Sequence, residues 1–302
     1  MLLVCASSID FSRKLPDRSP PPDPHPMTRI RIALLALALF AYARPAHAQQ
    51  VIWRGRSGGY DVVWMNSDIT ARRASDGAFV FSARRITDAE WREMQGDHDA
   101  DVPVREYERK YRLLSVAGSI ISLEEATYCD CGGAHPISWT RFVSYDLVRG
   151  TAARPHPVAA TDLVPEADLV RALTADPLIR QAMAGAHARG FTSLRALTAA
   201  LKSQPVQPAG QECTYAVGEE FATAFALHHL ENGRVALRFS LSHDVEVCRG
   251  MMIQVGVLVP PLARVAPDVA AANARRTGYL MKDVRTVAAQ RQTVLNYRPR
   301  GR

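Results

Sequence analysis

Alternation of apolar and polar residues is the commonest pattern along this chain. A period of two residues is typical of β-strands that bury one face, and turn residues separate the alternating runs. One run contains Tyr60 to Trp64, and Gly118 divides the longest one. The pattern therefore predicts strands over residues 51–54, 60–64, 78–83, 105–117, 119–131 and 137–147.

A helical block interrupts this alternation. Over residues 162–188 and 192–203, apolar side chains recur every three or four positions, which predicts amphipathic helices. Strand patterns return over residues 214–260, where Asn232-Gly233 between apolar runs is a strong hairpin signal. The order of strands, helices and strands predicts an α+β fold, namely an antiparallel sheet with a central helical insertion packed on it.

A shorter helix is expected between two of the early strands. Thr87 and Glu90 have the spacing of a capping box, in which each side chain accepts from a free amide at a helix start. This spacing predicts a helix from Asp88 to about Gln95.

An export signal begins inside the chain. Two arginines follow Met27, a short apolar stretch comes next, and Ala46-His47-Ala48 has the small-x-small form of a cleavage site. The apolar stretch is too short to cross a bilayer. We therefore expect residues 27–48 to be a signal peptide and the protein to be periplasmic or secreted. The proline-rich residues 1–26 are expected to be a disordered mis-start of translation.

Composition divides the remaining chain into three parts. Residues 49–104 carry the N-terminal strands and the short helix, and residues 105–265 carry the main α+β domain. Residues 266–302 hold eight basic and two acidic residues and are expected to form a basic tail. Such a tail is typical of a solvated segment, and it also suits contact with an anionic membrane surface. Nucleic acid is not an expected partner of an exported protein.

Four cysteines lie beyond the signal, and an even number in an exported chain predicts two disulfides. Three connectivities are open for Cys129, Cys131, Cys213 and Cys248. In a regular strand Cys129 and Cys131 would lie roughly 7 Å apart at Cα, so a direct bond between them would be strained. A zinc or copper(I) site that adds His135 to these two thiolates is a weaker hypothesis. We expect neither a metal nor a cofactor.

The densest motif is Tyr-Cys-Asp-Cys-Gly-Gly-Ala-His-Pro at residues 128–136, followed by Tyr-Asp-Leu at 145–147 and a turn that ends at Gly150. Over residues 105–262 this pattern resembles the RsiV-like (PdaC-like) extracytoplasmic domain. The cysteine pair of the motif is not part of that family's pattern. The resemblance implies a binding or sensing domain whose partners are cell-wall polymer or lysozyme-like hydrolases.

The loop and the strand that follows it are the predicted contact surface. The candidate ligand-binding residues are Gly132, Gly133, His135, Trp139, Arg141 and Tyr145. The last three share one face of the predicted strand and offer aromatic and arginine anchors. The same alternation would also arise if this face were simply core or solvent-facing sheet.

Catalytic motifs are scarce. The chain contains no Gly-x-Ser-x-Gly elbow, no His-Glu-x-x-His and no phosphate-binding loop. Adjacent His228 and His229 on a strand would point to opposite faces and so would not share one metal ion. The sequence therefore predicts an exported, non-enzymatic binding domain of the cell envelope. The alternative is a periplasmic hydrolase of cell-wall polymer that uses His135 and Asp146 as acid and base.

Overall fold

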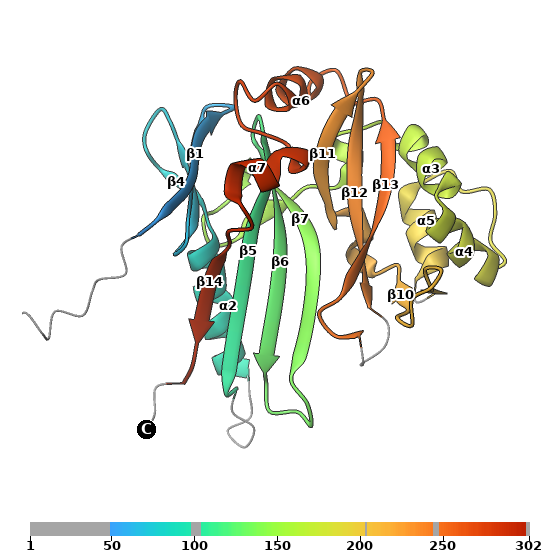
Figure 1. Cartoon of the computed structure of the whole chain (residues 1–302), viewed down its shortest axis with the longest axis horizontal. Helices are drawn as coiled ribbons and strands as arrows, with labels where there is room; N and C mark the ends of the chain where they lie inside the picture. The colour runs from blue at the N-terminus through green and yellow to red at the C-terminus, as the bar shows by residue number, and fades with distance from the viewer. Residues whose placement is uncertain (1–48, 98–103, 203, 244–247, 300–302) are drawn as a thin grey trace, which may run out of the picture. The chain divides into compact units, whose positions relative to one another are not determined.

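The computed structural model describes residues 49–97, 104–202, 204–243 and 248–299. The described residues all belong to one unit, Gln49–Arg302. The predicted mis-start and signal peptide lie outside the described residues. Figure 1 shows three antiparallel sheets and a group of helices inserted between strands. The predicted α+β class with a central helical insertion is confirmed, although the strands form three sheets and not one.

The longest strands form the middle of a five-stranded sheet. Its order is β14 (Thr293–Tyr297), β5 (Glu106–Ala117), β6 (Ile120–Asp130), β7 (Ile137–Gly150) and β8 (Pro155–Pro157). Strands β5 and β6 form the hairpin expected from the alternation, since Ala117 pairs with Ile120 across a two-residue turn. Gly118 takes the first turn position at φ +59°, a conformation that glycine adopts without strain.

Two further sheets pack against the two faces of this one. A four-stranded meander runs through β1 (Val51–Ser57), β2 (Tyr60–Met65), β3 (Ile69–Arg73) and β4 (Phe79–Ser82). The last sheet contains β9 (Pro205–Val206), β10 (Tyr215–Ala216), β11 (Phe225–Glu231), β12 (Arg234–His243) and β13 (Met252–Val259). The meander shares a core with one face of β5–β7, and Leu114 and Phe142 on the other face pack with Ala226 of β11.

The tight turn between β11 and β12 follows its sequence signal. Asn232 and Gly233 have φ angles of +48° and +72°, and Glu231 pairs with Arg234 across them. Positive φ at both central residues is the requirement of the type I′ turn, which matches the twist of the strands it joins.

The inserted helices cover one face of the β11–β13 sheet. They are α3 (Glu166–Ala175), α4 (Pro177–Gly185) and α5 (Leu194–Leu201), with the short turns η1 (Ala160–Asp162) and η2 (Glu219–Ala222) on either side. Figure 1 shows these helices beside β13, and Leu169, Leu173 and Leu197 are fully buried in one core with Phe225 and Phe239 of the sheet. The helical spacing of the sequence thus places the apolar side of the block against the sheet.

The short helix of the N-terminal part starts earlier than predicted. Helix α2 spans Ala83–Asp97, and the Ser82 hydroxyl accepts from the Arg85 amide at 3.1 Å, as an N-cap does. The Thr87–Glu90 capping box is therefore wrong. Thr87 lies inside the helix and donates to the Ala83 carbonyl at 2.8 Å, while Glu90 accepts from Tyr107.

The basic C-terminal segment is integrated into the fold as far as it is described. It forms α6 (Ala266–Asn273), η4 (Met281–Asp283), α7 (Val284–Ala288) and β14, and β14 completes the edge of the sheet beside β5 (Figure 1). Buried Tyr279 and Leu295 from this segment share a core with Tyr60 and Trp64. Residues 266–299 thus differ from the solvated tail that their charge suggested.

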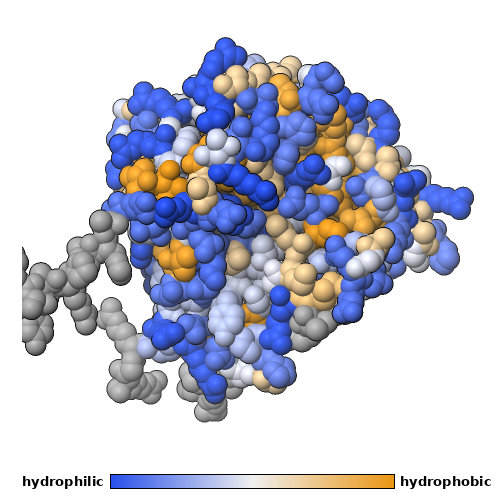
Figure 2. Space-filling model, viewed as in Figure 1, coloured by the Kyte–Doolittle hydropathy of each residue, from blue (hydrophilic) through white to orange (hydrophobic). Residues whose placement is uncertain are grey.

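Hydrophilic side chains cover most of the face seen in Figure 2, with hydrophobic patches between them. Among the described residues, no helix is long and apolar enough to cross a membrane.

Candidate functional site

The loop that joins β6 to β7 holds half of the predicted ligand-binding residues. Gly132 has φ +80°, so the chain turns there in a way that suits glycine. Gly133 and His135 are exposed to solvent at the tip of the loop. These residues are therefore accessible to a partner, as a contact surface requires.

Two disulfide bonds form, between Cys129 and Cys131 and between Cys213 and Cys248. The prediction that the first bond would be strained assumed a regular strand through both cysteines. That assumption is wrong. Strand β6 ends at Asp130, so the chain has already left the extended shape at Cys131, and the two Cα atoms lie 5.2 Å apart. This separation falls inside the usual range for a disulfide. Each bond fixes a segment next to the loop.

The segment after Cys248 packs on the start of β7. The Gly250 amide donates to the Ser138 carbonyl at 3.0 Å, and the Thr140 hydroxyl donates to the Gly250 carbonyl at 2.8 Å. The Arg249 guanidinium donates to the Pro136 carbonyl from the same side. The loop and this segment are thus one hydrogen-bonded unit with a disulfide on each part.

This unit presents apolar side chains to solvent. Ile137 and Met251 are each 48% exposed, and His135, two residues before Ile137, is exposed as well. We call the surface formed by residues 131–138 and 248–251 the cystine-braced surface. Because hydrogen bonds and disulfides already hold it, a partner would not have to order it on binding.

The remaining predicted residues lie along β7 and point mostly inward. Arg141 and Tyr145 both reach the fully buried Glu125 carboxylate, at 3.2 Å and 3.0 Å. Arg109 of β5 reaches the same carboxylate at 3.3 Å, and it also contacts Glu90 of α2 at 3.1 Å. We call these five residues the Glu125 network.

The electrostatics of the Glu125 network favour the ion pairs. Burial lowers the pKa of the Arg109 guanidinium, but the neighbouring Glu125 and Glu90 carboxylates outweigh this effect and raise it well above its usual value. Burial and the Glu125 carboxylate raise the pKa of the Tyr145 phenol, which therefore stays protonated and donates. The network is a buried structural feature, although Arg141 remains 28% exposed at its edge.

Trp139 lies between the two groups. It pairs with Thr127 across the sheet, which places it on the same face as Arg141, and it is half-buried. The structure therefore divides the six predicted residues. Gly132, Gly133 and His135 lie in the exposed loop, whereas Arg141 and Tyr145 converge on Glu125.

The acid–base pair of the hydrolase alternative does not come together. His135 precedes β7, whereas Asp146 lies near the other end of that strand, nine residues beyond Ile137. At about 3.3 Å per residue the separation along the strand is roughly 30 Å, far outside hydrogen-bond reach of one substrate bond. Asp146 instead accepts from the Val148 amide at 2.9 Å and from Arg149 at 2.8 Å.

The two adjacent histidines differ from expectation. A β-bulge between Leu227 and His229 breaks the alternation of β11, so His228 and His229 point the same way with their Nδ1 atoms 2.7 Å apart. The argument that they face opposite sides is wrong. Within the described part of the chain, no group of three or more His, Cys, Asp or Glu side chains is placed to hold a metal ion.

Sequence reasoning missed Glu125 and Met251. Glu125 occupies an inward position of β6, next to the inward Leu123 and Thr127, and a carboxylate at such a position is a signal for a buried charge network. Met251 had no local signal, because its exposure depends on packing against β7.

No family model, no curated protein and no solved structure matches this chain. The resemblance to the RsiV-like domain stays a prediction.

Proposed function

We propose that this protein is an exported, non-enzymatic binding protein of the cell envelope. In this proposal the cystine-braced surface holds a protein partner of the lysozyme-like hydrolase class. The supporting observation is the exposure of Ile137 and Met251 on two segments that hydrogen bonds join and disulfides hold. Rigid apolar side chains at the centre of a contact surface are typical anchors of protein partners.

Export is supported by two independent features. The sequence from Met27 to Ala48 has the order of a signal peptide. Two disulfides also fit an oxidising compartment, since such bonds are rare in the reducing cytosol. The proposal therefore places the working protein in the periplasm or outside the cell.

A protein partner fits the surface better than a glycan. Sugars are commonly held on aromatic rings, but Ile137 and Met251 are aliphatic and Trp139 is half-buried. Cell-wall polymer is therefore an alternative outcome of the test and is not the expected ligand.

The test is a binding measurement with the oxidised, exported protein, offered lysozyme in one arm and soluble peptidoglycan fragments in the other. We expect lysozyme to bind, and Ile137→Ser or Met251→Ser to weaken that binding about tenfold each, as loss of an apolar anchor does. The matched control is Val148→Ser. Val148 is 66% exposed but lies at the other end of β7.

Each outcome decides the proposal. Loss of binding in the two variants with retention in Val148→Ser supports it. Equal binding by all variants would refute the cystine-braced surface. Binding of peptidoglycan alone would refute the protein partner, and binding of neither would refute the proposal as a whole.

A further inference from the structure

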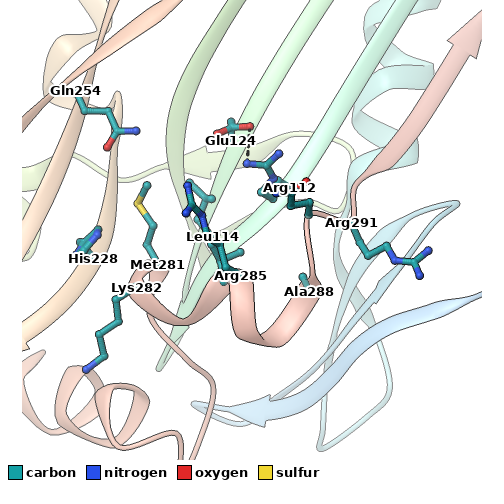
Figure 3. A pocket seen from close by; sticks show the side chains of 12 residues that line it. Arg112, Leu114, Glu124, His228, Gln254, Met281, Lys282, Arg285, Ala288 and Arg291 are labelled. Atoms are coloured by element: carbon teal, nitrogen blue, oxygen red, sulfur yellow. Dashed lines mark ion pairs between the residues drawn. The ribbon is translucent and has the colours of Figure 1, made fainter.

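A second surface of the molecule carries a cavity. A cleft of about 530 Å³ lies where β5 and β6 face β11, β13 and the η4–α7 segment (Figure 3). Its volume falls in the range of roughly 300–1,000 Å³ that is typical of small-molecule sites. It is separate from the cystine-braced surface, because none of the residues of that surface lines it.

The walls of the cleft are strongly basic. Its ionised lining comprises four cations, Arg112, Lys282, Arg285 and Arg291, against the single carboxylate of Glu124. A cleft with one sign of charge concentrates ligands of the opposite sign, because its low-dielectric walls focus the field. The cleft therefore selects for anions.

The positive electrostatic field of the cleft also affects His228, which lies in the cleft wall. Burial and, to a smaller extent, the positive charges of Arg238 and Lys282 together lower the pKa of His228 to about 4. His228 is thus neutral at neutral pH. It can hydrogen-bond to an anionic ligand and, unlike a carboxylate, it does not compete with that ligand for the cations.

Arg112 and Arg285 are the cations best placed to hold an anion. Lys282 already donates to Asn273 at 2.7 Å, and Arg291 to Gln50 at 3.4 Å; both side chains point away from Arg112 in Figure 3. The Arg285 side chain extends toward the Arg112–Glu124 pair in that view.

These two guanidinium groups have unused hydrogen-bonding capacity. Arg112 contacts Glu124 at 3.4 Å, and its Nε is a buried donor that lacks a hydrogen-bond partner. The Arg285 side chain is exposed and makes no ion pair within the part of the chain that the structure describes. Two guanidinium groups in one cleft suit a carboxylate or phosphate, which each can bind through two N–H groups.

The floor of the same cleft is apolar. Met281 and Val284 line it and are half-buried, so they present hydrocarbon to the cleft, whereas the lining residues Leu114 and Ala288 are already buried. A ligand that fills the cleft must therefore cover hydrocarbon as well as charge.

We propose that this cleft binds a small amphiphilic anion, with its carboxylate or phosphate head between Arg112 and Arg285 and its alkyl part on Met281 and Val284 of the floor. This binding activity is independent of the protein partner proposed above. Glu124 acts as the competing internal anion, since its carboxylate occupies one side of Arg112 until the ligand arrives.

The test is calorimetric titration of the full oxidised protein with octanoate, octyl phosphate, inorganic phosphate and the uncharged octyl glucoside. We expect both octyl anions to bind and octyl glucoside to fail. Arg285→Gln should weaken the binding of both anions about tenfold, the usual cost of losing a charged hydrogen-bond donor. Because Arg285 is exposed and unpaired within the described chain, this variant is expected to fold.

Two further variants separate the ligand site from a general charge effect. Arg180→Gln removes an exposed arginine of α4, outside the cleft, and should leave the affinity unchanged. Glu124→Gln should tighten anion binding, because it removes the competing carboxylate. A merely structural role of these residues would not produce a gain.

The results that overturn the proposal are specific. Equal binding of octyl glucoside would refute the anion requirement, and binding of inorganic phosphate as tight as octyl phosphate would refute the apolar floor. Unchanged affinity in Arg285→Gln would refute the head position. None of these results depends on whether lysozyme binds, so this proposal and the proposed function fail separately.

Discussion

Replacement of Glu125 tests the energetics of the buried charge network. The Glu125 side chain is fully buried, and the Arg109 side chain that contacts it is only 3% exposed. Glu125→Gln keeps the shape but removes the charge, which leaves two guanidinium groups with a weaker partner. Breaking a buried ion pair from one side costs about 3–5 kcal/mol, since the remaining charge stays desolvated.

The structure places the expected cost at the lower end of that range. Arg109 keeps Glu90 at 3.1 Å, and Arg141 is partly exposed and can recruit water. We therefore expect Glu125→Gln to lower the free energy of unfolding by about 3 kcal/mol. With a urea m-value of about 2–3 kcal/mol/M, the unfolding midpoint would fall by roughly 1 M.

The control is the adjacent position on the opposite face of β6. Glu124 pairs with Arg112 at 3.4 Å, and both side chains are partly exposed, at 22% and 34%. Glu124→Gln should cost less than about 1 kcal/mol, as half-exposed ion pairs do. If urea unfolding gave the two variants equal costs, the argument from burial would be refuted. The double variant Arg109→Met/Glu125→Leu should recover much of the loss, because it removes both buried charges together.

Three further predictions concern other parts of the fold. Cys213→Ser with Cys248→Ser opens a disulfide of sequence separation 35 and should cost about 3–4 kcal/mol in denaturant unfolding; a loss below about 1 kcal/mol would contradict the loop-entropy account. Gly233→Val, at φ +72°, should cost about 1–2 kcal/mol and lower the melting temperature, whereas an unchanged melt would show that the turn tolerates a side chain. His228 is half-buried with a pKa lowered to about 4, so the unfolded state binds the extra proton as the pH falls below about 6.5. Stability should therefore fall by about 1–2 kcal/mol between pH 6.5 and pH 4 after allowance for solvent screening, and His228→Asn should flatten that part of the profile.

Local signals predicted much of the fold. The β5–β6 hairpin and the Asn232-Gly233 turn were foreseen because turn residues and alternation are properties of neighbouring positions. The start of α2 was misplaced because Ser82 and Thr87 are both able to cap, and only the tertiary contact of Thr87 with Tyr111 decides between them.

The proposed binding surfaces are harder to predict because they join distant segments. Arg112, His228 and Arg285 line one cleft although more than 50 residues separate each from the next along the chain. Arg141 was expected to face a ligand, but the inward Glu125 on the neighbouring strand draws it toward the core. No periodicity within one segment encodes such pairings.

The pairing of β14 with β5 has a consequence for how the chain reaches its final state. Tyr297 pairs with Tyr107, so the β5 edge of this five-stranded sheet stays open until residues 293–297 have been synthesised. Contacts of such long sequence separation slow folding, and an open strand edge invites pairing with other chains. The protein should therefore depend on chaperones that hold the unfinished chain during synthesis, and a chain shortened before Thr293 should aggregate although its helices and other strands are intact.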